Sequence, residues 1–157
     1  MDTDDTDQRT GPFWDFVAGR AGPSPAAKTL SWALLAIDSE AGTITVGFEA
    51  LPSFTNSLGT VQGGFLAAML DDTLGPALVA TLAADQFAPT VELKVNFLRP
   101  ARPGRLVGNG RVVHRGGTIA FLEGDLRDAD GQLLATATAT ARIVQTQRTV
   151  RSSRSKP

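Results

Sequence analysis

Residues 58–78, LGTVQGGFLAAMLDDTLGPAL, decide the fold that the sequence predicts. Two adjacent glycines open an apolar run that carries Asp71 and Asp72 at its middle and then meets a proline. We predict a helix from about Gly63 to about Leu82, with a kink near the proline. Because a helix that is apolar on nearly every side must be covered nearly all round, we expect this helix to lie at the centre of the fold.

The segments around this helix indicate strands. The pattern predicts a short helix over 12–19, a loop over 20–28, a hairpin within 31–50 and a loop over 51–62. After the helix, strand patterns cover 90–99, 105–115, 118–128 and 132–145, and glycines in the second of these predict a bulge or a close backbone approach. This order indicates an α+β protein with an antiparallel β-sheet wrapped around a long central α-helix.

The composition limits what the protein does. The chain has 157 residues, a net charge of -1 and no cysteine. This excludes disulfides and thiol chemistry and argues against a nucleic-acid partner, which requires a basic face. We expect no membrane span and no metal site, a cytoplasmic location, and a single domain over residues 11–147. An acidic tail at 1–10 and a basic tail at 148–157 are expected to be disordered.

The central helix carries the candidate chemistry. Glycine at a helix start lets a substrate oxygen approach free backbone N–H groups, as in an oxyanion hole, although a glycine pair also suits a plain tight turn. Aspartate is a poor residue inside a helix, so Asp71 and Asp72 indicate either a site or two structural contacts. The two side chains point about 100° apart, so we expect only one to face a site.

Helix geometry separates the two halves of such a site. Gly63 and Asp71 are eight residues apart, which is about 12 Å of helix rise. An aspartate side chain does not close that distance. If both groups act on one carbonyl, they come from two chains, and the hypothesis predicts a symmetric homodimer with shared active sites.

The sequence resembles the hotdog-fold acyl-CoA thioesterases of the phenylacetate-degradation type. Their signature is a loop asparagine, then His-Gly-Gly at the start of the central helix, then a helix carboxylate. Here Asn56 precedes Gln62-Gly63-Gly64, and Asp71 follows Gln62 by nine residues. The resemblance covers about residues 40–145, including the segments DDTLGPAL, TVELKVNFLRPA and GRVVHRGGTIAFLEGDLRDADGQLLATATATARI.

The resemblance implies a hotdog fold, a dimer that pairs into a homotetramer, and hydrolysis of an acyl-CoA thioester without a cofactor. It implies that Asp71 is general base or nucleophile and that the Gly63 N–H polarises the carbonyl. Asn56 and Gln62 would position the carbonyl or the water, and Thr90, from the chain that supplies Asp71, would orient that water. Asp72 has no counterpart in this scheme and is interpreted as structural.

Three further sets of residues receive assignments from the sequence. Relatives often bind phosphate near the turn that holds Arg115, Gly116 and Gly117, so these residues are candidates for contacting CoA. The single histidine, His114, matches no catalytic position and is interpreted as a surface residue. Three aromatic residues are either pocket or core residues: Phe54, Phe65 and Phe87.

The signature histidine is replaced by Gln62, which donates hydrogen bonds but does not titrate. The replacement favours an alternative function, a non-catalytic acyl-CoA-binding hotdog protein. A hotdog dehydratase or hydratase ranks third, because such enzymes rely on a histidine and His114 is poorly placed for that role.

Overall fold

The computed structural model describes residues 10–146. Its helices, in chain order, are α2 (Pro12–Val17), α3 (Pro25–Thr29), the 3-10 helix η1 (Pro52–Phe54) and α4 (Gly63–Val79). Its strands are β1 (Ala33–Asp38), β2 (Thr43–Ala50), β3 (Gln86–Phe87), β4 (Thr90–Phe97), β5 (Gly104–Arg115), β6 (Ile119–Asp128), β7 (Leu133–Arg142) and β8 (Val144–Gln145). The predicted tails, 1–10 and 148–157, lie outside the described residues except for Thr10.

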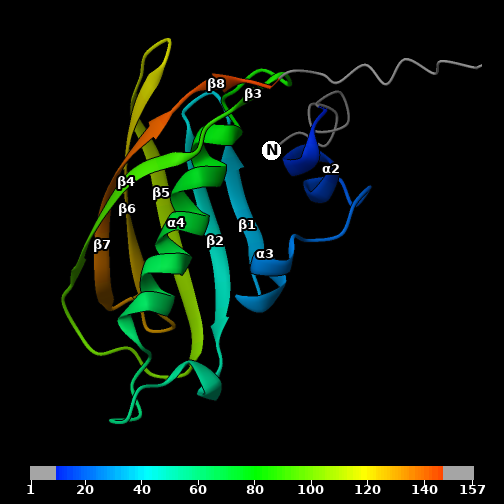
Figure 1. The fold of residues 1–157 in the computed structure, drawn as a ribbon. Coiled ribbons are helices and arrows are strands. Elements are labelled where there is room, and N and C mark those ends of the chain that lie inside the picture. The colour runs from blue at the N-terminus through cyan, green and yellow to red at the C-terminus, as the bar shows by residue number, and fades with distance from the viewer. Residues whose placement is uncertain (1–9, 147–157) are drawn as a thin grey trace, which may run out of the picture.

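Six strands form one antiparallel sheet in the order β1-β2-β5-β6-β7-β4. Three pairs are hairpins between consecutive strands, whereas β2 pairs with β5 and β4 pairs with β7 across longer connections. The sheet curves around α4, which runs along its concave face (Figure 1). The predicted α+β class and the antiparallel sheet around a central helix are confirmed.

The core lies between α4 and the sheet. From the helix, Met69, Leu70, Leu74 and Leu78 are fully buried. They face fully buried residues of the sheet, among them Val46, Leu106, Leu122, Leu126 and Leu134. Together these side chains remove a large apolar area from water, which is the main stabilising term for a domain of this size.

Glycines bring the sheet unusually close to α4. A Cβ atom on Gly108 would lie 2.3 Å from the Thr73 hydroxyl oxygen, and one on Gly124 would lie 2.9 Å from the Leu74 side chain. The predicted close backbone approach in 105–115 is therefore confirmed. The irregular register of that strand falls later, between Val112 and His114.

The N-terminal segment packs against α4 from the side that the sheet leaves open (Figure 1). The predicted helix over 12–19 is present as α2, and its buried residue is Trp14, while Phe13 and Phe16 are partly buried. The predicted loop over 20–28 is wrong in part, because residues 25–29 form α3. The Ser24 hydroxyl accepts a hydrogen bond from the Ala27 amide and caps this short helix.

Two predicted boundaries also differ from the structure. The central helix ends at Val79 rather than near Leu82, after running through Pro76. In β4 the predicted apolar face is only partly covered: Val95 packs against the core, whereas Val91 and Phe97 are 65% and 53% exposed. These two lie toward the ends of an edge strand, and α4 packs chiefly against β5, β6 and β2.

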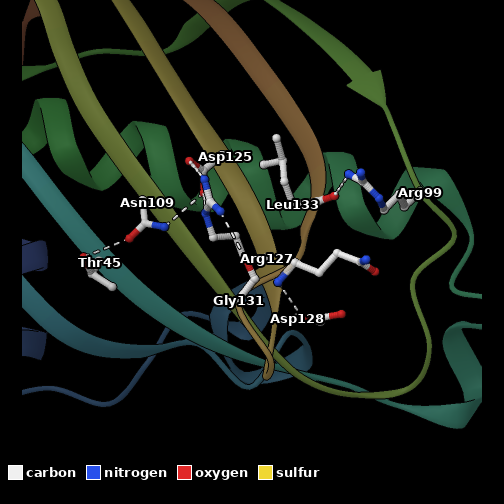
Figure 2. A network of polar contacts seen from close by, with 9 residues as sticks. Thr45, Arg99, Asn109, Asp125, Arg127, Asp128, Gly131 and Leu133 are labelled. Carbon is white, nitrogen blue, oxygen red and sulfur yellow. Dashed lines mark hydrogen bonds and ion pairs between the residues drawn. The ribbon is translucent and has the colours of Figure 1, made fainter.

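The convex face of the sheet carries a network of polar side chains. Asn109 accepts a hydrogen bond from Thr45 and donates one to Asp125, which also binds Arg127 through an ion pair (Figure 2). These residues come from β2, β5 and β6, with α4 behind the strands. The sheet thus has one apolar face toward the helix, and its opposite face carries this hydrogen-bonded network together with the half-exposed Phe121.

Within residues 10–146, no helix combines the length and apolar character needed to cross a bilayer.

Candidate active site

Asp71 lies at the middle of α4 and is exposed. The Thr90 hydroxyl, at the first residue of β4, donates a 2.8 Å hydrogen bond to its carboxylate. This places the two predicted site residues together in one chain. The bond fixes one carboxylate oxygen, and the solvent-facing position leaves the side chain open to a substrate.

Asp71 belongs to a narrow open stripe along α4. Gly64, Ala68 and Asp71 are exposed and Gly75 is half-buried. These positions are spaced by four, three and four residues, so they lie on one face of the helix. Apart from Asp71, the stripe contains only glycine and alanine, which let another backbone approach the helix closely.

Asp72 points away from that stripe. The Trp32 indole N–H donates a 2.8 Å hydrogen bond to the Asp72 main-chain carbonyl, which Pro76 leaves without its helical donor. The carboxylate oxygen Oδ2 is buried without a hydrogen-bond partner. Burial, with a smaller contribution from the neighbouring Asp71, raises the pKa of Asp72 from 3.8 to about 6.

The start of α4 forms a second half of the predicted site. Gln62 is the exposed N-cap residue and has an extended backbone conformation. Its main-chain N–H donates a 2.9 Å hydrogen bond to the Phe54 carbonyl. Gly63 begins the helix, where the first amides have no intrahelical acceptor. A pocket of about 380 Å³ adjoins Gly63 and is lined in part by Phe97 and Leu98.

The ring of Phe97 restricts Gly63. A Cβ atom at this position would lie 3.1 Å from the tip of that ring. A side chain at this position shifts the ring by a few tenths of an ångström, which the exposed Phe97 side chain can accommodate. The neighbouring Gly64 has open space around it.

Asn56 shapes the loop that leads to this helix start. Its side-chain oxygen accepts from the amides of Leu58 and Thr60, and its amide group donates to the Thr60 hydroxyl at 3.0 Å. These hydrogen bonds fix the conformation of the loop that precedes Gln62.

The two halves of the predicted site, the Gly63 amide and the Asp71 carboxylate, are not brought together within one chain. Because α4 is continuous from Gly63 to Val79, eight residues still separate Gly63 from Asp71, or about 12 Å of helix rise. One chain thus presents the amide at the helix start and the Asp71–Thr90 pair at the helix middle as separate features.

The candidate CoA-binding residues lie at the β5–β6 turn. The Arg115 guanidinium donates to the main-chain carbonyl of Thr81 and, at 3.2 Å, to its hydroxyl. Its positive charge thereby stabilises the C-terminal end of α4. Gly116 and Gly117 complete the turn, in which the Gly116 amide donates to the Ile119 carbonyl. The exposed His114 ring lies 6.4 Å from that of Phe121, as expected for a surface histidine.

The sequence did not reveal a pocket between the N-terminal segment and α4. It encloses about 520 Å³, and its lining includes Phe16, Trp32 and Asp72. None of the three phenylalanines considered from the sequence lines it: Phe54 stacks on Phe65 at 4.1 Å, and Phe87 is exposed. The signal available in the sequence was Pro76, because it frees the Asp72 carbonyl for a donor from elsewhere in the chain.

Within residues 10–146, histidine, aspartate and glutamate form no group of three that could hold a metal ion.

Comparison with known proteins identifies the family. The model of the Thioesterase superfamily matches residues 58–135. A candidate esterase of Saccharolobus solfataricus is 36% identical over 112 residues, which cover 71% of this chain and 79% of that protein. Human acyl-coenzyme A thioesterase 13 is 29% identical over 103 residues, which cover 63% of this chain and 71% of that protein.

A solved structure gives the same result. It is a candidate thioesterase of Ralstonia eutropha JMP134, described as a phenylacetic acid degradation-related protein, with 42% sequence identity and a TM-score of 0.78. The match covers 83% of this chain and 98% of that one. The chain therefore belongs to the thioesterase superfamily, has its hotdog fold, and falls in the class of thioester hydrolases.

Proposed function

We propose that the protein hydrolyses acyl-CoA thioesters to the free acid and CoA, as a cytoplasmic homodimer with two shared active sites. The observation that carries the proposal is the exposed Asp71 carboxylate, held by Thr90 at the middle of α4. The similarity to human acyl-coenzyme A thioesterase 13 supports acyl-CoA as the substrate class.

The chemistry uses one group from each chain. The Gly63 amide and the dipole of its helix bind the thioester oxygen and stabilise its developing negative charge. Asp71 of the other chain removes a proton from water, whose oxygen attacks the carbonyl carbon. The C–S bond then breaks, the acid is released, and the departing CoA sulfur takes up a proton.

A second route has Asp71 attack the carbonyl carbon directly. The carboxylate oxygen bonds to the carbonyl carbon, the C–S bond breaks, and CoA leaves as the thiolate. Water then hydrolyses the mixed anhydride, which releases the acid, restores the Asp71 carboxylate and supplies the proton that the CoA sulfur takes up. In both routes Thr90 keeps one carboxylate oxygen hydrogen-bonded, while Asn56 and Gln62 of the Gly63 chain position the carbonyl or the water. Arg115, Gly116 and Gly117 are proposed to contact CoA.

Two surfaces favour association of two chains. The small-residue stripe of α4 around Asp71 is open, and the edge strand β4 presents Val91 and Phe97 to solvent. An open strand edge with exposed apolar side chains is a surface that proteins normally cover. Two antiparallel copies of α4 would bring each Gly63 toward the other chain's Asp71, and two such dimers would form the proposed homotetramer.

A complementation assay tests the shared site. Asp71→Asn and Gly63→Pro, which removes the N–H at a position where proline suits a helix, are each expected to abolish thiol release from an acyl-CoA panel. Unfolded and refolded together, the two variants form mixed dimers with one intact site each. The mixture should therefore regain about one quarter of the wild-type activity.

Two outcomes contradict the proposal. Wild-type turnover by a folded Asp71→Asn variant would exclude the carboxylate from the reaction. An inactive mixture of variants that do form mixed dimers would exclude sharing of the site between chains. Two controls are needed: each variant alone must stay inactive after the same refolding, and wild-type protein must recover its activity.

The second candidate function is acyl-CoA binding without turnover, and Gln62 favours it because glutamine does not titrate. Calorimetry with a non-hydrolysable acyl-CoA analogue separates the two functions. Tight binding by a wild-type protein that releases no thiol from any acyl-CoA supports the binding function.

A further inference from the structure

The pocket between the N-terminal segment and α4 is walled in large part by aromatic rings. It encloses about 520 Å³, which lies within the range of small-molecule sites. Phe13 and Phe16 line it from α2, where they are three residues apart and so lie on one face of that helix. Trp32 lines it from the position before β1. The ring centroids of Phe16 and Trp32 are 5.5 Å apart and the rings are tilted by 53°, so the two rings form a corner rather than a stack.

The charged side chains of the lining are acidic. Asp15 and Asp72 line the pocket, and no lysine, arginine or histidine among residues 10–146 does. Asp15 is held in an ion pair by Arg20 at 3.0 Å, whereas Asp72 has no ion-pair partner in the described part of the chain. Burial raises the pKa of Asp72 to about 6, so its carboxylate is charged at about pH 8. The α4 side of the pocket therefore carries a negative charge that no described side chain balances.

The lining offers few free acceptors to a ligand that must donate hydrogen bonds. The Asp15 carboxylate already binds Arg20, and the Oδ2 atom of Asp72 is buried. The Ser24 hydroxyl already accepts a hydrogen bond from the Ala27 amide. A ligand with ammonium N–H groups would therefore lose its hydrogen bonds to water without replacing them all. A cation without N–H groups avoids this cost.

Trp32 places the aromatic corner beside the negative charge. Its indole N–H donates a 2.8 Å hydrogen bond to the Asp72 main-chain carbonyl, and its ring lies against that of Phe16. The faces of aromatic rings attract cations, and rings grouped around a cavity bind methylated ammonium heads. Attraction between a cation and a carboxylate needs no direct contact, because it acts over several ångströms where water is excluded.

We propose that this pocket binds a quaternary ammonium ion that carries an apolar substituent. The cationic head lies against the rings of Phe16 and Trp32, and the substituent fills the remaining apolar volume beside Phe13. Asp72 acts on the head through its charge and not through a hydrogen bond. Anions are disfavoured, because they would meet that charge in a site largely removed from water. The inference goes beyond the proposed hydrolysis and does not depend on it, since the binding is measured without a thioester.

Three ligands with the same benzyl group test the selection. They are benzyltrimethylammonium, neopentylbenzene, in which carbon replaces the charged nitrogen, and benzylammonium, which has three N–H groups. In titration calorimetry of the full chain at about pH 8, the quaternary ion should bind about tenfold more tightly than its neutral isostere. It should also bind more tightly than benzylammonium. Equal affinity for the quaternary ion and the isostere, tighter binding of benzylammonium, or no binding of any of the three would overturn the inference.

Two variants test the groups that recognise the cation. Asp72→Asn keeps the shape of the side chain and removes its charge, and Phe16→Leu replaces a ring by an aliphatic side chain. In each, the preference for the cation over the isostere should fall about threefold or more. The matched controls are Glu40→Gln and Phe121→Leu, which change exposed residues outside the lining and should keep the wild-type preference. An unchanged preference in either folded pocket variant, or an equal fall in the controls, would contradict the assignment.

The two tryptophans of the chain locate the bound cation. Trp32 lines this pocket and Trp14 does not. In an NMR titration with benzyltrimethylammonium, the indole N–H resonance of Trp32 should therefore shift more than that of Trp14. A larger shift at Trp14 would place the ligand elsewhere and overturn the inference.

Discussion

The Trp32 indole N–H donates a 2.8 Å hydrogen bond to the main-chain carbonyl of Asp72, which lies four residues before Pro76. Proline has no amide hydrogen, so this carbonyl would otherwise lack a donor inside the helix. The residue that fills the gap lies 40 positions earlier in the chain. One bond therefore both completes α4 and fixes the wall of the pocket against it.

Replacing Trp32 should destabilise the fold through this bond. Trp32→Phe removes the N–H and leaves the Asp72 carbonyl without a donor, at an expected cost of about 1–3 kcal/mol in the free energy of unfolding. Urea denaturation of the wild type and the variant measures this cost. Some of it reflects the smaller ring, so a second variant is needed to isolate the bond.

Pro76→Ala provides that variant, because alanine restores an amide for the Asp72 carbonyl. In the Pro76→Ala background, Trp32→Phe should cost less than it does in the wild type, with a coupling of about 1 kcal/mol. The same cost in both backgrounds would show that the indole acts only through packing.

Asp72 should make stability fall as pH rises. Its pKa is raised from 3.8 to about 6, so the folded state holds this proton more tightly than the unfolded state does. The contribution of this proton to the free energy of unfolding is fully present below about pH 4. It declines between about pH 4 and 6 and is lost above that range. Asp72→Asn should therefore be more stable than the wild type near pH 7.5 by about 1–2 kcal/mol, a figure reduced for partial exposure.

Thermal unfolding of both proteins across this pH range checks the expectation. The difference between them should close toward about pH 4, where the wild-type carboxyl is protonated. Parallel stability curves for the two proteins would show that Asp72 is not the group responsible.

Thr90 should affect rate more than stability. Thr90→Val removes the hydroxyl that binds Asp71 and should lower kcat/KM on the preferred acyl-CoA roughly tenfold, because the bond is made to a charged group. Thr90 is exposed, so unfolding free energy should change by less than about 0.5 kcal/mol. Thr90→Ser, which keeps the hydroxyl, should retain most of the activity; equal losses in both variants would argue against this role.

Gly108 should tolerate no side chain while Thr73 is present. A Cβ atom would lie 2.3 Å from the Thr73 hydroxyl oxygen, so Gly108→Ala should destabilise the fold by about 1–3 kcal/mol. Thr73→Ala removes the closest atoms and leaves the Phe48 ring, at 3.2 Å, so the double variant should be more stable than the sum of the two single changes predicts. Chemical denaturation of the wild type, the two single variants and the double variant gives the coupling free energy between the two positions. Additive costs would show that the strain in Gly108→Ala does not come from Thr73.

The central helix and the strands were predictable because their apolar patterns persist over long segments. The close approach of β5 to α4 was also predictable, from glycines inside a strand pattern. α3 was missed because five residues carry no apolar period, although Ser24 followed by Pro25 is a recognisable helix start. The exposure of Val91 could not be predicted, because alternation does not tell which strand lies at the edge of the sheet.

The candidate site was predictable only in part. The helix start and the mid-helix aspartates are visible in the sequence, and helix rise alone separates Gly63 from Asp71. Thr90 is different, because its contact with Asp71 depends on where β4 begins in space, and only the resemblance pointed to it. The environment of Asp72 depends on Trp32 and the N-terminal segment, and no local pattern connects these residues with the middle of α4.

The position of β4 in the sheet has a consequence for the order in which the chain folds. Within the described residues, β4 has one sheet neighbour, β7, and the ribosome makes that strand only after β5 and β6. Before β7 (Leu133–Arg142) leaves the ribosome, Thr90 has no strand to pair with. The hydrogen bond from Thr90 to the Asp71 carboxylate therefore forms only after β7 has been made. The Asp71–Thr90 pair is therefore assembled late in synthesis, when the last long strand closes the sheet.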